Sequence, residues 1–367
     1  MTVSVDFTAL LHKAASGKPL DSHEAESAFH AIMAGDVDPV HLSAFLTALK
    51  MRGETLAELT GAVQAVRHHM TLLPNVPANA IDVCGTGGDG LKTLNVSTAV
   101  AFVLAGLGVP VAKHGNRALS SATGATDVLE VLGIPPTDDL ILQARRLRDN
   151  GLVFLAAPQH HPAMRHAGPV RKALGFRTLF NLLGPLCNPA QVRHQLIGVF
   201  EGGWCEPVAR ALGALGSQSV WVVHGTTDEG GSDELTLSGT SQVCAWEKES
   251  LISLKIDPEM AGLPSSPISS IRGGDARTNA EALLALLDGA QGAYRDTVLL
   301  NAAAALHVAG RGDIVKSGTI DVQAFHRNVD LAAESIDRGL ARASLDRIRG
   351  TIDLPIHFIA STDAGRS

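Results

Sequence analysis

The sequence predicts an α/β protein with a small all-helical domain and a larger α/β domain, in which helices flank a mostly parallel central sheet. Residues 1 to about 72 carry helical patterns only. After Ala80, short runs that are apolar throughout alternate with helix-like segments, as buried parallel strands do. A glycine-rich loop follows the first of these runs. The length of 367 residues accommodates two domains.

Helix-start signals in the N-terminal part predict four helices with short connections. Asp21–Glu24 and Thr55–Glu58 have the spacing of a capping box, and Asp38 precedes a proline at a first helical position. We expect the helices that begin at Asp38 and Thr55 to end near Gly53 and Met70. The surplus apolar faces of these helices must pack against the rest of the chain or against a second copy.

The remaining elements predict the domain organisation. Strands are expected at Ala80–Cys84, Val109–Ala112, Leu152–Ala157, Gln195–Phe200, Ser219–His224 and Gln242–Trp246, and late helices at Asn279–Leu287, Asp296–Ala309 and Asp321–Arg349. We expect a helical domain over residues 1–74, to which residues 162–184 return, and an α/β domain over 78–161 and 185–367.

Composition restricts the classes of protein. The net charge of −7 argues against a broad nucleic-acid surface. No apolar run approaches the ~20 residues of a membrane span, and the N-terminus lacks the features of a signal peptide. The four cysteines are far apart with no CxxC pair, which indicates reduced thiols in a cytoplasmic protein. We therefore expect neither nucleic acid nor membrane as a partner.

The stretch Gly85–Gly90 is predicted to bind phosphate. It lies between a buried strand and a helix start, where glycines let the backbone approach an anion and the helix presents unpaired N–H groups. It also matches GxGxxG, but a dinucleotide site needs an acidic residue after the next strand. Lys113, His114 and Arg117 stand there instead. This favours a small molecule with several phosphates, and no GK[ST] sequence supports a Walker loop.

A second anion site is predicted just after this basic strand end. Ser120–Thr126 is a hydroxyl-rich loop that precedes a short helix expected at Asp127–Leu132. Carboxyl ends of strands are where open α/β sheets bind ligands. Two such loops facing one crevice could hold two phosphate groups of one ligand.

Acidic and basic side chains elsewhere complete the candidate site. Asp233 and Glu234 follow another strand, and Mg²⁺ is commonly held by one or two carboxylates plus substrate phosphates. The pair Asp228–Glu229 lies in the same loop and is an equal candidate. His160 and His161 are expected to form a polar wall, and Arg171 and Arg177 are possible partners of a substrate carboxylate, each lying on a predicted helix.

Several long stretches, in this order, resemble anthranilate phosphoribosyltransferases. They are GTGGDGLKTLNVST, AKHGNRALSSATGATDVLEVLG, HHPAM, VRKALGFRTLFNLLGPLCNPA and SDELTLSG. The resemblance runs from the N-terminal helices to ESIDRGLA near the end. It implies transfer of the phosphoribosyl group of 5-phosphoribosyl 1-diphosphate (PRPP) to the amine of anthranilate, the second step of tryptophan biosynthesis from chorismate. The products are N-(5-phosphoribosyl)anthranilate and diphosphate.

The resemblance also implies roles for individual residues. For PRPP they are Gly85, Gly88, Asp89, Thr93, Asn95, Val96, Ser97, Thr98, Lys113, His114, Gly115, Asn116, Arg117, Ala118, Leu119, Ser120, Ser121 and Ala125. For anthranilate they are Gly85, His114, Asn116, His161 and Arg171, and for Mg²⁺ they are Ser97, Asp233 and Glu234. No general base is assigned. A homodimer through the helical part is implied as well.

The chain departs from the family pattern in three places. Ala125 stands where a serine is usual, Ala122-Thr123 replaces a Ser-Arg/Lys-Ser run, and the loop before Asp233 is longer. Two other functions stay open: a phosphorylase of pyrimidine nucleosides, which shares the architecture, and a non-catalytic relative that binds nucleic acid.

Overall fold

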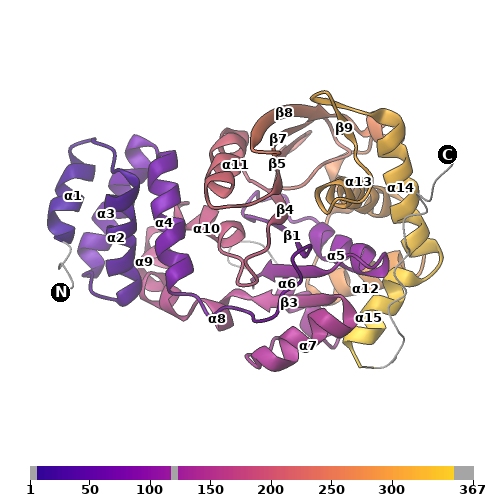
Figure 1. Ribbon diagram of the computed structural model, residues 1–367, viewed down its shortest axis with the longest axis horizontal. Coiled ribbons are helices and arrows are strands. Elements are labelled where there is room, and N and C mark those ends of the chain that lie inside the picture. The colour runs from indigo at the N-terminus through magenta and orange to yellow at the C-terminus, as the bar shows by residue number, and fades with distance from the viewer. Residues whose placement is uncertain (1–5, 117–122, 351–367) are drawn as a thin grey trace, which may run out of the picture.

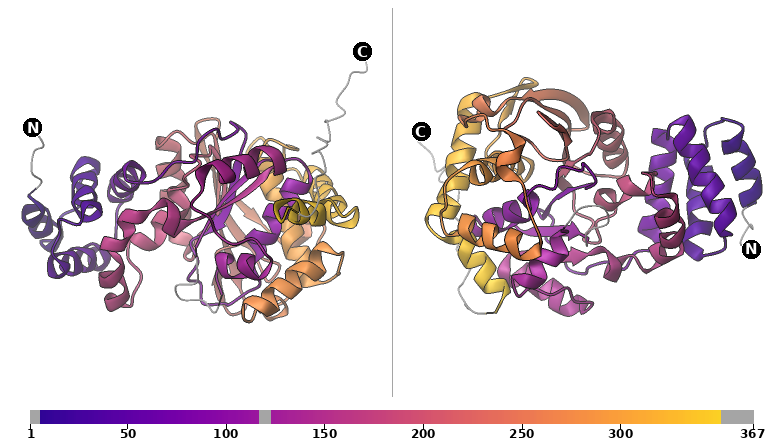
Figure 2. Two further views of the ribbon diagram at one scale, coloured as in Figure 1. Left: turned by 90° about the horizontal axis from the view of Figure 1, so that it is seen from below. Right: turned by 180° about the vertical axis from the view of Figure 1, so that it is seen from behind.

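The computed structural model describes residues 6–116 and 123–350. A group of N-terminal helices stands at one end of an elongated molecule, and a sheet flanked by helices forms the rest (Figure 1). Views from below and from behind show the same separation, with the late helices α14 and α15 at the end remote from the N-terminal helices (Figure 2). The predicted fold class is confirmed.

The N-terminal helices begin where the capping signals predict. They are α1 (Phe7–Ala15), α2 (Ser22–Ala34), α3 (Pro39–Arg52) and α4 (Leu56–His68). Asp21 and Thr55 each form a complete capping box, with Glu24 and Glu58 respectively. Glu58 is fully buried and also pairs with Arg52, so one carboxylate joins the ends of α3 and α4.

One large sheet organises the rest of the chain. Its strands run in the order β3-β2-β1-β4-β5-β7-β8, and β6 pairs with β5. The bounds are β1 (Ile81–Gly85), β2 (Val111–Gly115), β3 (Leu152–Ala156), β4 (His194–Gly198), β5 (Ser219–Thr227), β6 (Gly230–Ser232), β7 (Ser241–Glu247) and β8 (Ser250–Ile256). Pairing is parallel from β3 to β5 and antiparallel from β5 to β8. Strands β6 and β8, and the small β9–β10 ribbon (Val315–Lys316 and Thr319–Ile320), were not predicted.

Two large hydrophobic clusters lie against the sheet. One is built around α5 (Val96–Gly106) and α13 (Ala293–Val308), and includes α12 (Ala276–Leu287). The other is continuous from the N-terminal helices through α11 (Cys205–Ala214) to sheet residues such as Ile197 and Val222. The surplus apolar faces of the N-terminal helices therefore pack, in part, against the rest of the chain, as expected.

The segment after β3 returns to the N-terminal helices. It contains α8 (Ala157–His160), the 3₁₀ turn η1 (Pro162–His166), α9 (Gly168–Leu174) and α10 (Phe180–Leu186). Helix α9 contacts α3, and α10 contacts α4. Arg67 of α4 donates to the Leu186 carbonyl at 2.8 Å, which ties the two parts together.

Helix predictions need correction in two places, and one helix was not predicted. The helix expected over Asp321–Arg349 is two helices, α14 (Val322–Asp337) and α15 (Leu340–Ile348). They are separated at Gly339, whose φ of 69° interrupts the helix. The helix expected at Asp127–Leu132 is α6 (Ala125–Val131), because Gly124 is its N-cap. The helix α7 (Leu140–Asn150) was not predicted. No helix in the described ranges is long and apolar enough to cross a membrane.

Candidate active site

A cavity of about 690 Å³ lies at the carboxyl ends of β1 and β2. One wall comes from the sheet and the first turn of α5, and the facing wall comes from the segment of α8 to α10. Every described residue that the resemblance assigns to PRPP, anthranilate or Mg²⁺ lines this cavity. The predicted residues Arg117, Ala118, Leu119, Ser120 and Ser121 lie outside the described residues.

The glycine loop begins at Gly85, at the end of β1. Gly87, Gly88 and Gly90 have φ values of 66°, 78° and 83°, which side chains rarely allow. Gly85 has another reason to be glycine, since a Cβ there would lie 2.1 Å from the Asp233 carboxylate. The backbone at the start of the loop thus packs directly against the acidic pair.

The helix α5 begins directly after this loop. Its first-turn residues Val96, Ser97 and Thr98 line the cavity. The Ser97 N–H donates to Glu234 Oε1 at 3.2 Å. Thr98 is buried, and its hydroxyl has no hydrogen-bond partner among the described residues. A helix start with N–H groups and a hydroxyl at a cavity is a favourable site for an anion.

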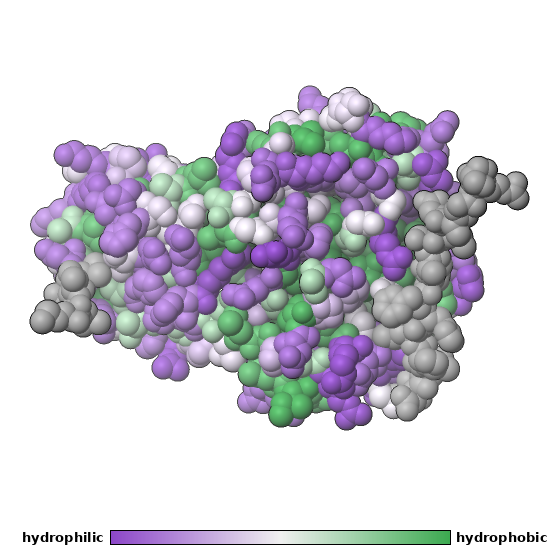
Figure 3. All heavy atoms as spheres, viewed as in Figure 1, coloured by the Kyte–Doolittle hydropathy of each residue, from purple (hydrophilic) through white to green (hydrophobic). Residues whose placement is uncertain are grey.

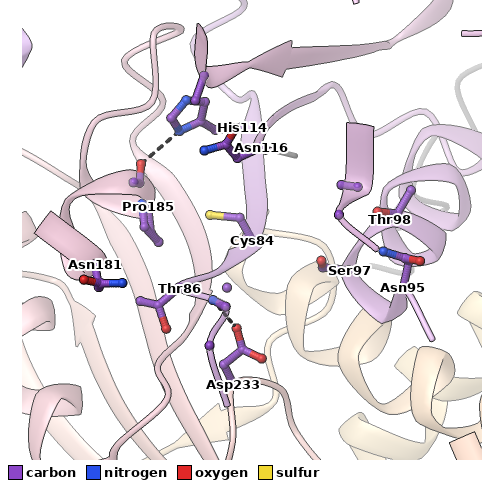
Figure 4. A pocket seen from close by; sticks show the side chains of 18 of the residues that line it. Cys84, Thr86, Asn95, Ser97, Thr98, His114, Asn116, Asn181, Pro185 and Asp233 are labelled. Atoms are coloured by element: carbon purple, nitrogen blue, oxygen red, sulfur yellow. Dashed lines mark hydrogen bonds between the residues drawn. The ribbon is translucent and has the colours of Figure 1, made fainter. Parts of the chain in front are cut away.

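The carboxylates of Asp233 and Glu234 are half-buried and lie close to Asp89. Asp233 Oδ2 accepts the Gly87 N–H at 2.7 Å (Figure 4). Burial and the charges of Asp89 and Glu234 raise the pKa of Asp233 well above its usual range. Burial also raises the pKa of Glu234, to about 7. Crowded carboxylates of this kind fit a divalent cation that neutralises them.

The other candidate pair, Asp228–Glu229, forms its bonds outside the cavity. The Asp228 carboxylate accepts from the Ser238 hydroxyl at 2.6 Å and from the Ile268 N–H at 3.1 Å. Glu229 forms an ion pair with Arg272 at 2.5 Å. Neither residue lines the cavity, so the structure favours Asp233–Glu234 for the cation.

The end of β2 supplies the basic side of the cavity. Lys113 is buried, and its positive charge lowers the pKa of Glu234, which partly offsets the effect of burial on that carboxyl. His114, Gly115 and Asn116 follow it along the cavity wall. A Cβ at Gly115 would lie 3.6 Å from that of Ala125, an ordinary van der Waals contact, so the neighbouring Ala125 does not by itself require glycine there.

The facing wall carries the groups predicted for a substrate carboxylate. The Arg171 guanidinium lies 5.1 Å from the centre of the Phe180 ring, and burial lowers its pKa from the ordinary value. The rings of His114 and His161 are 5.0 Å apart. Burial lowers the pKa of His114 to about 3 and that of His161 to about 4, so both are neutral at pH 7.

Two other polar residues that the sequence predicts for the site, His160 and Arg177, do not line the cavity. His160 does not line the cavity, because its Nδ1 bonds the Thr71 carbonyl oxygen at 2.9 Å in the connection after α4. Arg177 does not line it either, and it lies between α9 and α10 and not on a helix as predicted. It donates to the Gly88 carbonyl and stacks on the Phe200 ring, with 4.4 Å to the centroid.

Sequence reasoning missed Phe180, Asn181, Gly274 and Asn279, which also line the cavity. Gly274 is followed by Asp275, the N-cap of α12. A glycine pair before a capped helix is a signal that could have pointed to this segment.

Comparison with known proteins agrees with this geometry. Residues 8–70 match the glycosyl transferase family, helical bundle domain, and residues 77–342 match the glycosyl transferase family, a/b domain. The anthranilate phosphoribosyltransferase of Gluconobacter oxydans is 83% identical over 367 residues, which is 100% of both chains. That of Rhodopseudomonas palustris strain HaA2 is 49% identical over 346 residues, covering 94% of this chain and 98% of the relative.

The chain belongs to the anthranilate phosphoribosyltransferases. Solved members of this family share the fold. The enzyme from Thermus thermophilus aligns with a TM-score of 0.84 at 38% identity, over 93% of this chain and 98% of the other. The enzyme from Saccharomyces cerevisiae in complex with PRPP and Mg aligns with a TM-score of 0.82 at 29% identity, over 94% and 97%. Anthranilate phosphoribosyltransferases are glycosyltransferases of tryptophan biosynthesis, and the predicted family is confirmed.

Proposed function

We propose that this chain transfers the phosphoribosyl group of PRPP to the amine of anthranilate. The observation that carries the proposal is a single cavity with two chemically different walls. One wall holds the glycine loop, the start of α5 and the acidic pair, and the other holds the Arg171 guanidinium. Related enzymes from Saccharomyces cerevisiae were solved with PRPP and Mg and with 4-fluoroanthranilate, which supports these two substrates.

PRPP is proposed to bind along the sheet-side wall. The glycine loop and the first turn of α5 present backbone N–H groups and the Thr98 hydroxyl to the diphosphate. Lys113 adds a buried cation at the end of β2. The positions from Gly85 to Thr98 and from Lys113 to Ala125 keep the PRPP-binding roles that the resemblance implies.

Mg²⁺ is proposed to bind at Asp233 and Glu234, with Ser97 nearby. Burial and the charges of Asp89 and Glu234 raise the pKa of Asp233, and burial together with the charge of Asp89 raises that of Glu234, so a cation beside them would favour their ionised forms. Among the described residues no three His, Cys, Asp or Glu side chains form a metal cage, which suits an ion that completes its ligands with water and phosphate. When bound, the ion would neutralise charge on the diphosphate as it leaves.

Anthranilate is proposed to bind against the facing wall. The planar guanidinium of Arg171 can pair with its carboxylate, and the stacking on Phe180 orients that guanidinium. The neutral rings of His114 and His161 line the path of the aromatic ring without a charge of their own. Asn116 and Gly85 complete the proposed contacts.

The reaction exchanges one bond at the ribose for another. The amine nitrogen bonds to ribose C1 as the bond from C1 to diphosphate breaks, and the electron pair departs with the diphosphate. The amine then loses one proton to solvent. An aromatic amine is neutral at pH 7, so the chain contributes mainly positioning and stabilisation of the leaving charge, and no residue is assigned as a general base.

A fluorescence assay tests the function. Purified protein, anthranilate, PRPP and Mg²⁺ are mixed, and the loss of anthranilate fluorescence is followed while diphosphate is measured separately. We expect one diphosphate for each anthranilate consumed, and no turnover when PRPP is left out or EDTA is added. A parent protein without turnover in the complete mixture refutes the proposal.

The same preparation tests the two other functions. Phosphorolysis of uridine or thymidine would indicate a pyrimidine-nucleoside phosphorylase, and a gel shift with DNA or RNA would indicate a nucleic-acid-binding relative. The acidic pair Asp233–Glu234 at the cavity speaks against a phosphorylase, and the net charge of −7 speaks against a nucleic-acid-binding relative. We expect neither activity, and no membrane partner.

A homodimer and a cytoplasmic location belong to the same proposal. Helix α3 exposes Val40 (73%) and Met51 (82%). They are eleven residues apart, about three turns, and so lie on one helix face together with Ala44. An apolar stripe of this kind fits a second copy of the chain. The four cysteines are buried and unpaired, which fits a reducing compartment.

A further inference from the structure

A segment outside the predicted motifs runs along the second half of the glycine loop. It leads from the 3₁₀ turn η4 (Ile268–Ile271) to the start of α12. The Leu94 N–H donates to the Ile271 carbonyl, and the Gly273 N–H donates to the Lys92 carbonyl, both at 2.8 Å. The backbone at the phosphate-binding loop is thereby paired with the approach to α12.

The side chain of Asn279, in the first turns of α12, adds two hydrogen bonds to this pairing. Its side chain is 2% exposed. Its Oδ1 accepts the Gly274 N–H at 2.8 Å, and its Nδ2 donates to Asn95 Oδ1 at 2.9 Å. A Cβ at Gly273 would lie 2.8 Å from Asn279 Oδ1 and 2.9 Å from the Thr93 carbonyl oxygen. Glycine at 273 is therefore required by close approach.

The bond to Asn95 has a consequence for the start of α5. Asn95 is the N-cap of this helix, and an N-cap asparagine ordinarily accepts the N–H of the second or third helical residue. Asn95 makes no such side-chain bond. Its Oδ1 is held by Asn279 instead, and its backbone oxygen accepts the Tyr294 hydroxyl at 3.1 Å.

The N–H groups in the first turn of α5 thus donate no hydrogen bond to the N-cap side chain. The Ser97 N–H donates to Glu234, a residue of the proposed cation site, and the Thr98 hydroxyl is buried without a partner among the described residues. The same segment also reaches the second loop, because the Thr123 hydroxyl donates to the Gly274 carbonyl at 2.9 Å. Asn279 therefore stands where three parts of the cavity wall meet.

We propose that Asn279 is a positioning residue of the PRPP site: by holding the side-chain oxygen of Asn95, it keeps the start of α5 open to the diphosphate of PRPP. The inference rests on the proposed function, since it names what acts on that site. Without Asn279, the freed Asn95 oxygen can cap α5 and compete with phosphate for the same N–H groups.

Calorimetric binding of PRPP with Mg²⁺, beside steady-state kinetics, tests this role. Asn279→Ala should weaken PRPP binding and raise the KM for PRPP by about tenfold, the scale of the N-cap interaction that phosphate would then have to displace. The KM for anthranilate should stay within about twofold, because the facing wall is not touched.

A double-mutant cycle with Asn95→Gly separates this role from general destabilisation. Glycine is tolerated at an N-cap and has no oxygen that could compete with phosphate. If Asn279 acts through the Asn95 side chain, then Asn279→Ala should change PRPP affinity by less than about twofold in the Asn95→Gly protein. If the two substitutions each reduce PRPP affinity and their effects multiply in the double variant, the proposal is overturned. An unchanged PRPP affinity in a folded Asn279→Ala protein would overturn it as well.

Asn328 provides a matched control. It is 3% exposed and its amide donates to the Ala303 and Gly312 carbonyls at 3.1 and 3.0 Å, but it does not line the cavity. Asn328→Ala should lower the melting temperature without moving either KM. If Asn279→Ala does not fold, Asn279→Leu, of similar volume, replaces it in both backgrounds. A parent that binds PRPP but forms no product refutes the proposed function, whereas calorimetry on the variants still decides the role of Asn279.

Discussion

The imidazole Nδ1 of His114 lies 2.9 Å from the backbone carbonyl oxygen of Gly184 (Figure 4). A carbonyl oxygen only accepts, so Nδ1 carries the ring proton and Nε2 carries the lone pair. Burial lowers the pKa of this imidazole to about 3, so the assignment holds throughout the neutral range. Nε2 is buried without a partner among the described residues, and the residue lines the cavity.

We expect Nε2 to accept a hydrogen bond from the anthranilate amine. His114→Asn can keep the donor to Gly184 but places nothing at the Nε2 position, so kcat/KM for anthranilate should fall by about tenfold. Thermal melting should show a smaller loss of stability for His114→Asn than for His114→Ala, which lacks the donor. An Asn variant as active as the parent would exclude this contact.

The two buried histidines should also make stability depend on pH. In the unfolded chain their pKa is about 6.5, whereas burial lowers the folded values to about 3 for His114 and about 4 for His161. The unfolded chain then binds protons that the folded chain does not, so stability is complete above pH 6.5 and declines as the pH falls toward 4.

Urea denaturation at pH 7.5 and pH 5 measures this dependence. Each histidine should remove about 2 kcal/mol of unfolding free energy between these two values. His161→Asn should therefore lose less stability than the parent on acidification. Equal losses in the two proteins would show that His161 titrates normally in the fold.

The helices and the parallel strands follow from short-range patterns, which is why the sequence predicts them. Capping at Asp21, Asp38 and Thr55 is local, and it appears in the structure as predicted. The break at Gly339 was missed, because glycine is also tolerated inside a helix and only its φ of 69° decides. Strand β8 was missed because its exposed, mixed pattern depends on pairing with β7.

The candidate site, too, was predicted where local patterns decide and missed where contacts in three dimensions decide. Its phosphate loops and its acidic pair follow strand ends and could be named from order along the chain. The choice of Asp233–Glu234 over Asp228–Glu229 depends on Ser238 and Arg272, which meet the second pair only in three dimensions. Asn279 is 184 residues from Asn95, and no pattern along the chain joins them.

Removing the charge of the acidic pair should weaken the response to Mg²⁺. Asp233→Asn and Glu234→Gln keep side-chain size, which matters because the Asp233 carboxylate is packed against Gly85, where even a Cβ would lie 2.1 Å from Oδ2. We expect the Mg²⁺ concentration for half-maximal activity to rise by about tenfold or more, since each variant lacks one carboxylate ligand. Asp228→Asn is the control, and it should respond to Mg²⁺ like the parent.

Replacing Arg171 should affect the carboxylated substrate selectively. Arg171→Ala removes the guanidinium that we place against the anthranilate carboxylate, so the KM for anthranilate should rise by about tenfold or more while that for PRPP changes little. Arg171→Lys should recover only part of this, because an ammonium lacks the planar fork and the stacking on Phe180. Lys172→Ala, at the exposed neighbouring position, serves as the control.

The apolar stripe on α3 should hold two copies of the chain together. Met51 is 82% exposed, and a charge there would be buried without a partner in a dimer. We expect Met51→Glu to convert a dimer into a monomer in light scattering at micromolar concentration, with a melting temperature that becomes independent of protein concentration. The control is Ile141→Glu on α7, where apolar side chains also reach the surface (Figure 3) and Ile141 is 81% exposed. Because α7 lies in the α/β part, away from α3, this variant should remain dimeric (Figure 1). A parent protein that is monomeric at these concentrations, or a Met51→Glu protein that remains dimeric, would rule out this face as the interface.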